Sequence, residues 1–342
     1  MAENMKTLAF FNTKSRVGKT SLVYHLAWMY AELGVRVIAA DLDPQSNLTS
    51  LFLEEERLEE LWPETKHTQS IVGAISPVIE GAGDMADPHI EPISNEIGLI
   101  VGDLELAGIE DTFSSEWQRC LDRAAYSFEV VSAFHRLLEV AAAKHNADLI
   151  LIDVGPNLGF INRAAMIAAD FIAVPLAADL FAPQGLRTVG PSLRNWREQW
   201  GERLAKAPDL KYKLPAGNMQ PIGYIATQQA FRQNRQTFAR GWWTNRIPQV
   251  YRNAVLGENE EQTGSTKVAT ENDPHLLARL KYYPSLMPMA LEAHKPMFLL
   301  KPADGAIGAH SGAVQHCYQD FRQLAVTLAE RCGVELPAPL YR

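Results

Sequence analysis

FFNTKSRVGKTS, residues 10–21, lies between a short apolar run and a helical pattern. The run over residues 8–11 predicts a strand, and the pattern over residues 20–33 predicts a helix that stops at Gly34. A Gly-Lys-Thr triplet in this context is typical of a loop that cradles phosphate groups. The helix N-terminus would attract the phosphates. Lys19 would add a point charge, and the Thr20 hydroxyl would ligate Mg²⁺. A chance triplet at a helix start is the alternative.

Lys14 gives this loop its particular character. A strict P-loop has a glycine where this chain has Thr13, five residues before Gly18. With a lysine five residues before Lys19, the loop resembles the deviant Walker A loop of the ParA/MinD family of ATPases, usually Lys-Gly-Gly-Val-Gly-Lys-Thr. The resemblance implies that Lys14 and Lys19 are catalytic and that Lys14 reaches the phosphates of a partner in an ATP-bound homodimer. It also implies an ATP site made by Thr13, Lys14, Ser15, Arg16, Val17, Gly18, Lys19, Thr20 and Ser21.

Ser15 and Arg16 replace the two middle glycines of the family's loop. Their β-carbons penalise positive φ values and fill space near the plane of the expected dimer. Arg16 would either add a cation near the phosphates, as an arginine finger does, or block the dimer by its bulk. Both readings stay open at this point.

Two aspartates follow the next predicted strand, residues 35–40. Asp41 and Asp43 lie two apart along an extended chain, so they share a side, at the end of the strand where open α/β sheets bind ligands. One carboxylate could hold the water shell of a metal while the other positions an attacking water. An N-cap aspartate before a turn at Pro44 is the alternative. The sequence Asp-x-Asp-Pro-Gln resembles the family's first switch, which implies that Asp43 acts in hydrolysis and near the metal.

A third carboxylate ends a strand predicted over residues 149–152, a continuous apolar run expected of a strand buried on both faces. Asp153 is the expected Walker B carboxylate, placed to hold a water on Mg²⁺; an ordinary strand-end aspartate is the alternative. Gly155 and Pro156 form a constrained turn that suits a γ-phosphate sensor. The order Asp153-x-x-Pro156, Asp179-x-x-x-Pro183, Gln184-Gly185-Leu186 also resembles ParA-type chains.

The remaining patterns predict the architecture around these motifs. Strands are expected over residues 97–104, 171–176 and 222–226. Helices are expected over residues 128–141, 162–169 and 309–332, and from residue 181 onward. Residues 53–66 predict a solvated helical face interrupted at Pro63, and residues 67–96 give only weak signals. Together with the resemblance, this predicts an α/β protein with a P-loop NTPase three-layer fold, a mostly parallel twisted sheet flanked by helices.

The chain length, the net charge and the number of cysteines limit which class of protein this chain can be. At 342 residues the chain suits a single domain, 1–342, with insertions at about 53–96 and 231–275. Its net charge of −8 argues against a wholly basic coat for nucleic acid, although a local basic face remains possible. Three cysteines in no metal-like or redox pair predict a reduced, cytoplasmic setting. No apolar run approaches the about 18 residues of a membrane span, and residues 1–6 lack a signal core.

Arginines alternate with aromatic residues over residues 231–252, and no acid interrupts them. This pattern is typical of surfaces that meet a phosphate backbone or a partner protein. An amphipathic segment with buried aromatics and solvated arginines is the alternative. Residues 257–273 predict an exposed loop. The candidate contacts to nucleic acid or a partner are Arg232, Arg235, Arg240 and Arg246.

The C-terminal part carries a weaker resemblance. Residues 283–286 and 292–297 resemble the family's stretch that covers the nucleotide base, which places Pro284 beside it. The MinD branch ends in an amphipathic membrane anchor, whereas residues 333–342 contain prolines and almost no basic face, so no membrane partner is expected.

Two functions are compatible with these features. The first is a ParA-like ATPase in which ATP and Mg²⁺ drive dimerisation. The dimer would engage DNA or a partner surface, and slow hydrolysis, stimulated by a partner protein, would reset it. Such a switch would serve in partitioning or positioning of DNA or cargo. The alternative is a nucleotide-gated binding module or regulatory subunit that hydrolyses ATP poorly because of Ser15 and Arg16.

Overall fold

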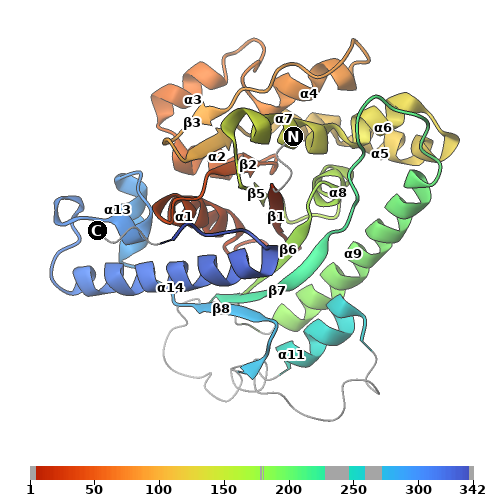
Figure 1. Cartoon of the computed structure of the whole chain (residues 1–342). Coiled ribbons are helices and arrows are strands. Elements are labelled where there is room, and N and C mark those ends of the chain that lie inside the picture. Colours follow the sequence, from red (N-terminus) through yellow and green to blue (C-terminus); the bar gives the residue numbers. More distant parts are fainter. Residues whose placement is uncertain (1–4, 178, 180, 228–245, 259–271, 339–342) are drawn as a thin grey trace.

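The computed structural model describes residues 5–177, 179, 181–227, 246–258 and 272–338. Within these residues eight strands form one sheet of order β3-β4-β2-β5-β1-β6-β7-β8 (Figure 1). Every pairing is parallel except that of β3 with β4. The strands are β1 Lys6–Phe10, β2 Val37–Asp41, β3 Glu91–Pro92, β4 Ile97–Ile100, β5 Leu149–Asp153, β6 Phe171–Ala177, β7 Gln220–Thr227 and β8 Leu276–Leu280.

Helices cover both faces of this sheet, so the predicted three-layer α/β fold is confirmed. One face is covered by α1 Lys19–Glu32, α2 Asn47–Phe52, α3 Glu55–Leu61, α13 Leu286–Glu292 and α14 Ala309–Cys332. The other is covered by α4 Ile71–Ile79, α5 Glu110–Arg119, α6 Ala125–Val131, α7 Ala133–His145, α8 Phe160–Ile167 and α9 Ala182–Leu204. A short helix, α11 Ile247–Val250, and a π-helical turn, Tyr251–Leu256, pack beside α9.

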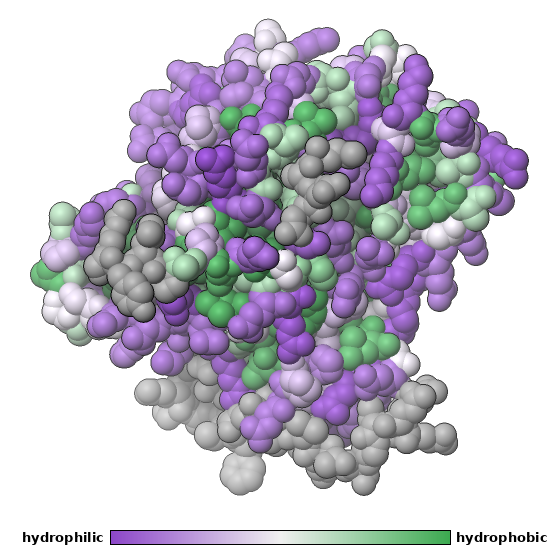
Figure 2. Space-filling model, viewed as in Figure 1, coloured by the Kyte–Doolittle hydropathy of each residue, from purple (hydrophilic) through white to green (hydrophobic). Residues whose placement is uncertain are grey.

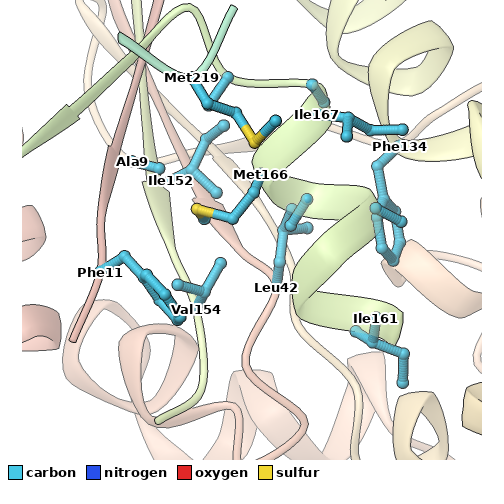
Figure 3. Close-up of a cluster of buried hydrophobic side chains, with 14 of the residues drawn as sticks. Ala9, Phe11, Leu42, Phe134, Ile152, Val154, Ile161, Met166, Ile167 and Met219 are labelled. Carbon is cyan, nitrogen blue, oxygen red and sulfur yellow. The ribbon is translucent and has the colours of Figure 1, made fainter. Parts of the chain in front are cut away.

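The apolar side chains of the central strands pack against the helices on both faces of the sheet. In β1, Leu8 and Phe10 pack on the α1 side, whereas Ala9 packs on the α8 side. Figure 3 shows Ala9 and Ile152 of the sheet beside Met166 of α8. Successive side chains of a strand point to opposite faces, so a strand buried on both faces needs an uninterrupted apolar run.

Several predicted boundaries are confirmed. Helix α1 ends before Gly34, whose φ of 78° and N–H bond to Ala31 O at 3.0 Å form the expected glycine stop. Helix α14 has the predicted bounds. Helix α3 ends before Pro63.

Three predictions need correction. Residues 67–96 contain helix α4, which Ser70 caps by accepting from Gly73 N at 3.2 Å. The period over residues 128–141 runs through two helices, α6 and α7, which meet at Ser132. Strand β4 stops at Ile100 because Asp103 caps a 3-10 helix, η1 Leu104–Ile109.

The surface, the helices and the cysteines bear on the predicted protein class. Figure 2 shows a face covered mostly by hydrophilic residues, with apolar residues in small separate areas. In the described part of the chain, no helix is long and apolar enough to cross a bilayer. Cys120, Cys317 and Cys332 are free thiols inside the core. The division into one domain with insertions at 53–96 and 231–275 stays a prediction.

Candidate nucleotide-binding site

The three sequence motifs meet at one edge of the sheet. Asp153 at the end of β5 pairs in register with Phe10 of β1 and with Asp41 of β2. All three strands are parallel, so the loops that leave them start side by side. The topology thereby brings together Lys19, Asp43 and Asp153, which lie up to 134 positions apart in sequence (153 − 19 = 134).

Asn12 holds the start of the loop after β1. Its Nδ2 donates to Pro175 O at 2.7 Å, and its Oδ1 accepts from Lys14 N at 3.0 Å. A β-carbon on Gly185 would lie 3.2 Å from this Oδ1, so the start of α9 approaches the loop closely. We assigned Asn12 no role from the sequence, although a polar residue that ends an apolar strand beside a phosphate loop is a usable signal.

The loop turns through positive φ at Arg16 (59°) and Gly18 (89°), but not at Ser15. Left-handed backbone costs a residue with a β-carbon about 1–3 kcal/mol, so the strain falls on Arg16 alone. Gly18 then caps α1, and neither a side-chain cap nor an acidic residue occupies the first turn. The first N–H groups of α1 therefore face the loop without a competing side-chain anion, as phosphate binding requires.

Lys19, Asp43 and Asp153 are all buried at this edge. Burial lowers the pKa of Lys19, against the opposing effect of the Asp153 and Asp43 charges. Burial also raises the pKa of Asp153 well above its usual range, and the charge of Asp41 adds to this. Thr20 lies near enough to oppose the shift, yet neither oxygen of Asp153 has a hydrogen-bond partner of ordinary geometry among the described residues.

This donor set fits Mg²⁺. Two carboxyl groups, from Asp43 and Asp153, lie near the Lys19 ammonium in a buried site, and among the described residues the Asp153 oxygens lack hydrogen-bond partners. A buried anionic oxygen without a partner is unfavourable, whereas Mg²⁺ prefers oxygen ligands and retains waters. Thr20, Asp43 and Asp153 are the residues that would hold the ion and its water shell.

Asp41 and Asp43 have different surroundings. Asp41 Oδ2 accepts from both Thr49 N and Thr49 Oγ1 at 2.8 Å, and burial raises the pKa of Asp41 to about 7. Asp41 therefore anchors α2, a role that the sequence did not predict. The Asp43 carboxylate accepts only from Gln45 N, at 3.0 Å, among the described residues. Its Oδ1 lies 3.3 Å from where a β-carbon of Gly155 would be, so it faces the turn after β5.

Two residues that the sequence did not single out hold that turn. Asn162 Nδ2 donates to Gly155 O at 2.9 Å and to Asn157 O at 2.8 Å. Glu110 of α5 accepts from Phe160 N and Ile161 N at 2.5 and 3.0 Å, so its carboxylate caps α8. Glu110 lies 50 residues before Phe160, and no local pattern could have linked them.

Lys14 lies within its own protomer's site. Its Nζ forms an ion pair with Asp179, and it sits 5.2 Å from the centre of the Phe181 ring. Phe181 is 65% exposed, so this end of the loop faces solvent. Asp179 was part of an ordered motif in the sequence, but its contact with Lys14 was not predicted.

An apolar cavity of about 210 Å³ adjoins the loop. Gly18 and Ser21 line it from the loop side, and the end of β8 and α14 close it through Tyr283 and Phe321. Tyr283 is held by its hydroxyl, which donates to Asp320 at 2.8 Å. The cavity has the position and character expected for a nucleotide base. The residues around Pro284 line it (Leu280, Lys281, Tyr282, Tyr283 and Met287), whereas Pro284 itself is not part of the lining.

His25 links the phosphate helix to this cavity. Its Nδ1 donates to Ser21 O at 2.7 Å, its Nε2 accepts from Met297 N at 3.2 Å, and its ring stacks on Phe321 at 4.8 Å. Both ring nitrogens are used by the neutral form, and burial lowers the pKa of His25 to about 4.

Acid should therefore weaken the fold through His25. Above pH 6.5 the His25 ring is neutral in both the folded and the unfolded state. Between pH 6.5 and 4 only the unfolded chain takes up the proton, so the free energy of unfolding falls as the pH is lowered. We expect this residue to account for a loss of about 2 kcal/mol between pH 7 and pH 5, measured by urea unfolding. His25→Gln should remove that part of the slope, whereas exposed His316→Gln should keep it. An unchanged slope in His25→Gln would contradict the assignment.

The predicted nucleic-acid or partner surface is only partly described. Arg232, Arg235 and Arg240 lie outside the described residues, as do residues 259–271 of the predicted loop. Arg246 lines a cavity of about 440 Å³ together with Arg187 of α9. At residues 251–252 the amphipathic alternative holds only for the aromatic residue: Tyr251 is buried, whereas Arg252 is not solvated but lies 3.6 Å from the buried Asp273.

The sheet order, the uncapped start of α1 and the buried carboxylates define a P-loop NTPase fold with a nucleotide-type site. Comparisons with known proteins agree. The family described as AAA domain matches residues 5–206, more than half of the chain. The chain belongs to this family, among the ParA/MinD P-loop ATPases and closest to the ParA/Soj branch.

Three curated relatives illustrate the match. Protein IncC of Escherichia coli is 30% identical over 197 residues, 58% of this chain and 48% of IncC. Sporulation initiation inhibitor protein Soj of Bacillus subtilis is 28% identical over 186 residues, 53% of this chain and 62% of Soj. Chromosome partitioning protein ParA of Caulobacter vibrioides is 28% identical over 205 residues, 59% of this chain and 67% of ParA. The matched part thus spans about half to two thirds of the length of these relatives.

Solved structures share the fold across nearly the whole chain. Protein DIP2308 from Corynebacterium diphtheriae has a TM-score of 0.67 at 22% identity, covering 96% of this chain and 99% of its own. A putative plasmid partition protein from Borrelia burgdorferi B31, solved with AMPPNP, has a TM-score of 0.54 at 17% identity, covering 96% of this chain and 100% of its own.

Proposed function

We propose that this chain is an ATP-dependent dimerisation switch that is reset by slow ATP hydrolysis. The observation that carries the proposal is Asp153, a buried carboxylate without a hydrogen-bond partner among the described residues, beside Lys19 at the N-terminus of α1, which has no side-chain cap. A charged group buried in this way is costly unless a ligand completes the site. MgATP is the ligand whose charges match: phosphates for Lys19 and the helix N-terminus, and a divalent cation for the carboxylates.

Each side chain has a part in this proposal. The N–H groups at the start of α1 and Lys19 bind the phosphates, and the apolar cavity beside Tyr283 takes the base. Bound Mg²⁺ would supply charge neutralisation at the β- and γ-phosphates. Asp43, which faces the Gly155 turn, orients the attacking water and accepts its proton. Lys14 leaves Asp179 and reaches the phosphates of a second protomer.

The biological role follows from the family. The names of relatives, chromosome partitioning protein and sporulation initiation inhibitor, support a role in partitioning or positioning of DNA or cargo. In this proposal the ATP-bound homodimer engages non-specific DNA or a protein surface, and a partner protein stimulates hydrolysis. Arg246, near Arg187 of α9, and the arginines of residues 231–240 are the candidate contacts.

A second function is favoured by Arg16. This residue is exposed, strained at positive φ, and part of the lining of the base cavity. A side chain held there would obstruct the approach of a second protomer. In that case the chain would be a nucleotide-gated binding module or regulatory subunit with weak or no hydrolysis.

Solution mass distinguishes the two functions. We expect a monomer with ADP and a dimer with ATP and Mg²⁺ by light scattering. In the same samples, retention on non-specific duplex DNA should require ATP and weaken steeply as salt rises, because bound arginines release counterions. An identical mass in both nucleotides would reject the switch, and dimerisation recovered in Arg16→Gly would then identify Arg16 as the obstruction.

A further inference from the structure

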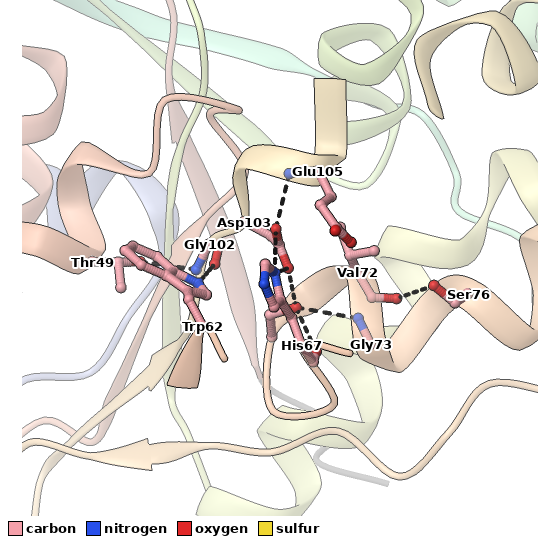
Figure 4. Close-up of polar contacts among 10 residues, drawn as sticks. Thr49, Trp62, His67, Val72, Gly73, Ser76, Gly102, Asp103 and Glu105 are labelled. Carbon is pink, nitrogen blue, oxygen red and sulfur yellow. Dashed lines mark hydrogen bonds and ion pairs between the residues drawn. The ribbon is translucent and has the colours of Figure 1, made fainter. Parts of the chain in front are cut away.

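A second polar cluster lies beside the nucleotide site, just beyond the C-terminal end of β4 (Figure 4). His67 comes from the segment between α3 and α4, whereas Asp103 and Glu105 come from the start of η1. One donor atom from each of the three side chains lies within 4.8 Å of the others. Among the described residues, this is the group of three possible metal ligands that meets this distance. Two segments that are 36 residues apart are thus joined through ionisable side chains.

The His67 and Asp103 donor atoms are already close to the spacing of two ligands in a coordination shell. His67 Nδ1 lies 3.0 and 2.9 Å from the two oxygens of Asp103, whose side chain is fully buried. Donors on a tetrahedral ion with bonds of about 2.0–2.1 Å are about 3.3 Å apart, so an ion would need only a small expansion of this pair. In its place the structure has a hydrogen bond, in which the ring proton lies where the ion would bind.

Asp103 is also oriented as a ligand should be. Its Oδ1 accepts from Glu105 N at 2.9 Å, and its Oδ2 accepts from Ser70 Oγ at 2.5 Å. Supporting hydrogen bonds of this kind fix a ligating carboxylate and leave a further lone pair on each oxygen. These hydrogen bonds hold the Asp103 carboxylate in one orientation, so the cluster is not a chance contact between flexible surface side chains.

A cavity gives access to the cluster. It has a volume of about 340 Å³ and is lined by His67, Glu105 and residues of α4, including Val72 and Ser76. Glu105 is exposed, so its carboxylate can turn toward the ion at little cost. The cavity would also hold the water that completes a four-coordinate shell.

We propose that His67, Asp103 and Glu105 bind a divalent transition-metal ion of the Zn²⁺ type. One imidazole and two carboxylates select such an ion over Mg²⁺, which prefers oxygen alone. On binding, His67 offers Nδ1 to the ion, in place of the hydrogen bond from this atom to Asp103. The site is separate from the Mg²⁺ ligands of the nucleotide site and does not depend on the proposed function.

The ion would fasten residues 62–70 to the sheet beside the nucleotide site. Gly102 N donates to Thr49 Oγ1 at 2.8 Å, and Thr49 Oγ1 donates to Asp41 at 2.8 Å. Trp62 Nε1 donates to Gly102 O at 3.0 Å on the opposite side (Figure 4). Asp103 follows Gly102 directly, so a bound ion restrains the segment that packs against Asp41.

Cobalt provides the direct test, since Co²⁺ occupies Zn²⁺ sites and its visible absorption reports an imidazole ligand and low coordination number. We expect the full-length protein, stripped with a chelator, to bind one equivalent of Co²⁺ with visible bands that Zn²⁺ abolishes. His67→Gln should weaken binding at least about 100-fold. Glu105→Gln, at an exposed position, should weaken it about tenfold without risk to the fold.

Two controls separate this site from others. His89→Gln breaks a comparable pair, His89 with Glu91 at 2.7 Å, which has no third ligand in the described residues, and should leave the bands unchanged. Asp153→Asn alters the nucleotide site and should also leave them unchanged. Bands that persist in both His67→Gln and Glu105→Gln, or the absence of bands in the unmodified protein, would overturn the proposal.

Discussion

Asp43→Asn should lower the rate of ATP turnover at least about 100-fold while ATP affinity and the ATP-bound dimer persist. Asp43 is the carboxylate of the pair that is not committed to the backbone of α2, and it faces the Gly155 turn. The amide of asparagine can still accept from Gln45 N, as Asp43 Oδ1 does at 3.0 Å. The substitution therefore removes the proton acceptor and changes little else.

The measurement is phosphate release under saturating ATP, together with solution mass. Asp209→Asn changes an exposed carboxylate in the segment that follows α9. This variant should retain the original rate and dimer. If Asp43→Asn kept more than a tenth of the turnover, Asp43 would not be the proton acceptor. Loss of both turnover and ATP affinity would instead assign Asp43 to binding.

Lys14→Ala should abolish ATP-dependent dimerisation while ATP affinity stays within about threefold, because the proposed target of Lys14 is the partner's phosphates. The structure adds an opposite expectation for Asp179, which pairs with Lys14 inside one protomer. Dimerisation must break this pair twice, once in each copy. A partly exposed ion pair is worth about 0.2–1 kcal/mol, so Asp179→Asn should tighten the ATP-bound dimer about fivefold.

Sedimentation at several protein concentrations measures both changes. Lys206→Ala, an exposed lysine beyond the end of α9, is the matched control and should behave as the unmodified chain. A joint loss of dimerisation and ATP affinity in Lys14→Ala would place Lys14 at its own protomer's phosphates. A weaker dimer in Asp179→Asn would mean that Asp179 supports the dimer rather than holding Lys14 back.

The phosphate loop and the helix that follows it were predictable because their determinants are local. Gly18 and Gly34 mark the start and stop of α1 through hydrogen bonds that span at most five residues. The closing helix, α14, was predictable for the same reason: its apolar residues recur with the period of one helix. Interruptions were harder, since the apolar period continues across Ser132, where α6 ends and α7 begins.

The sequence by itself therefore determined the α/β class, the phosphate loop and the carboxylates that end two of its strands. These are encoded by strand and helix periods and by turn residues, which act over a few positions. Only the tertiary structure decided which aspartate anchors α2, what holds Lys14, and that His67 meets Asp103. Some of those contacts join residues that are distant in the chain. In others, one side chain contacts several partners. Which partner a side chain takes depends on the register of the strands and the packing of the helices between them.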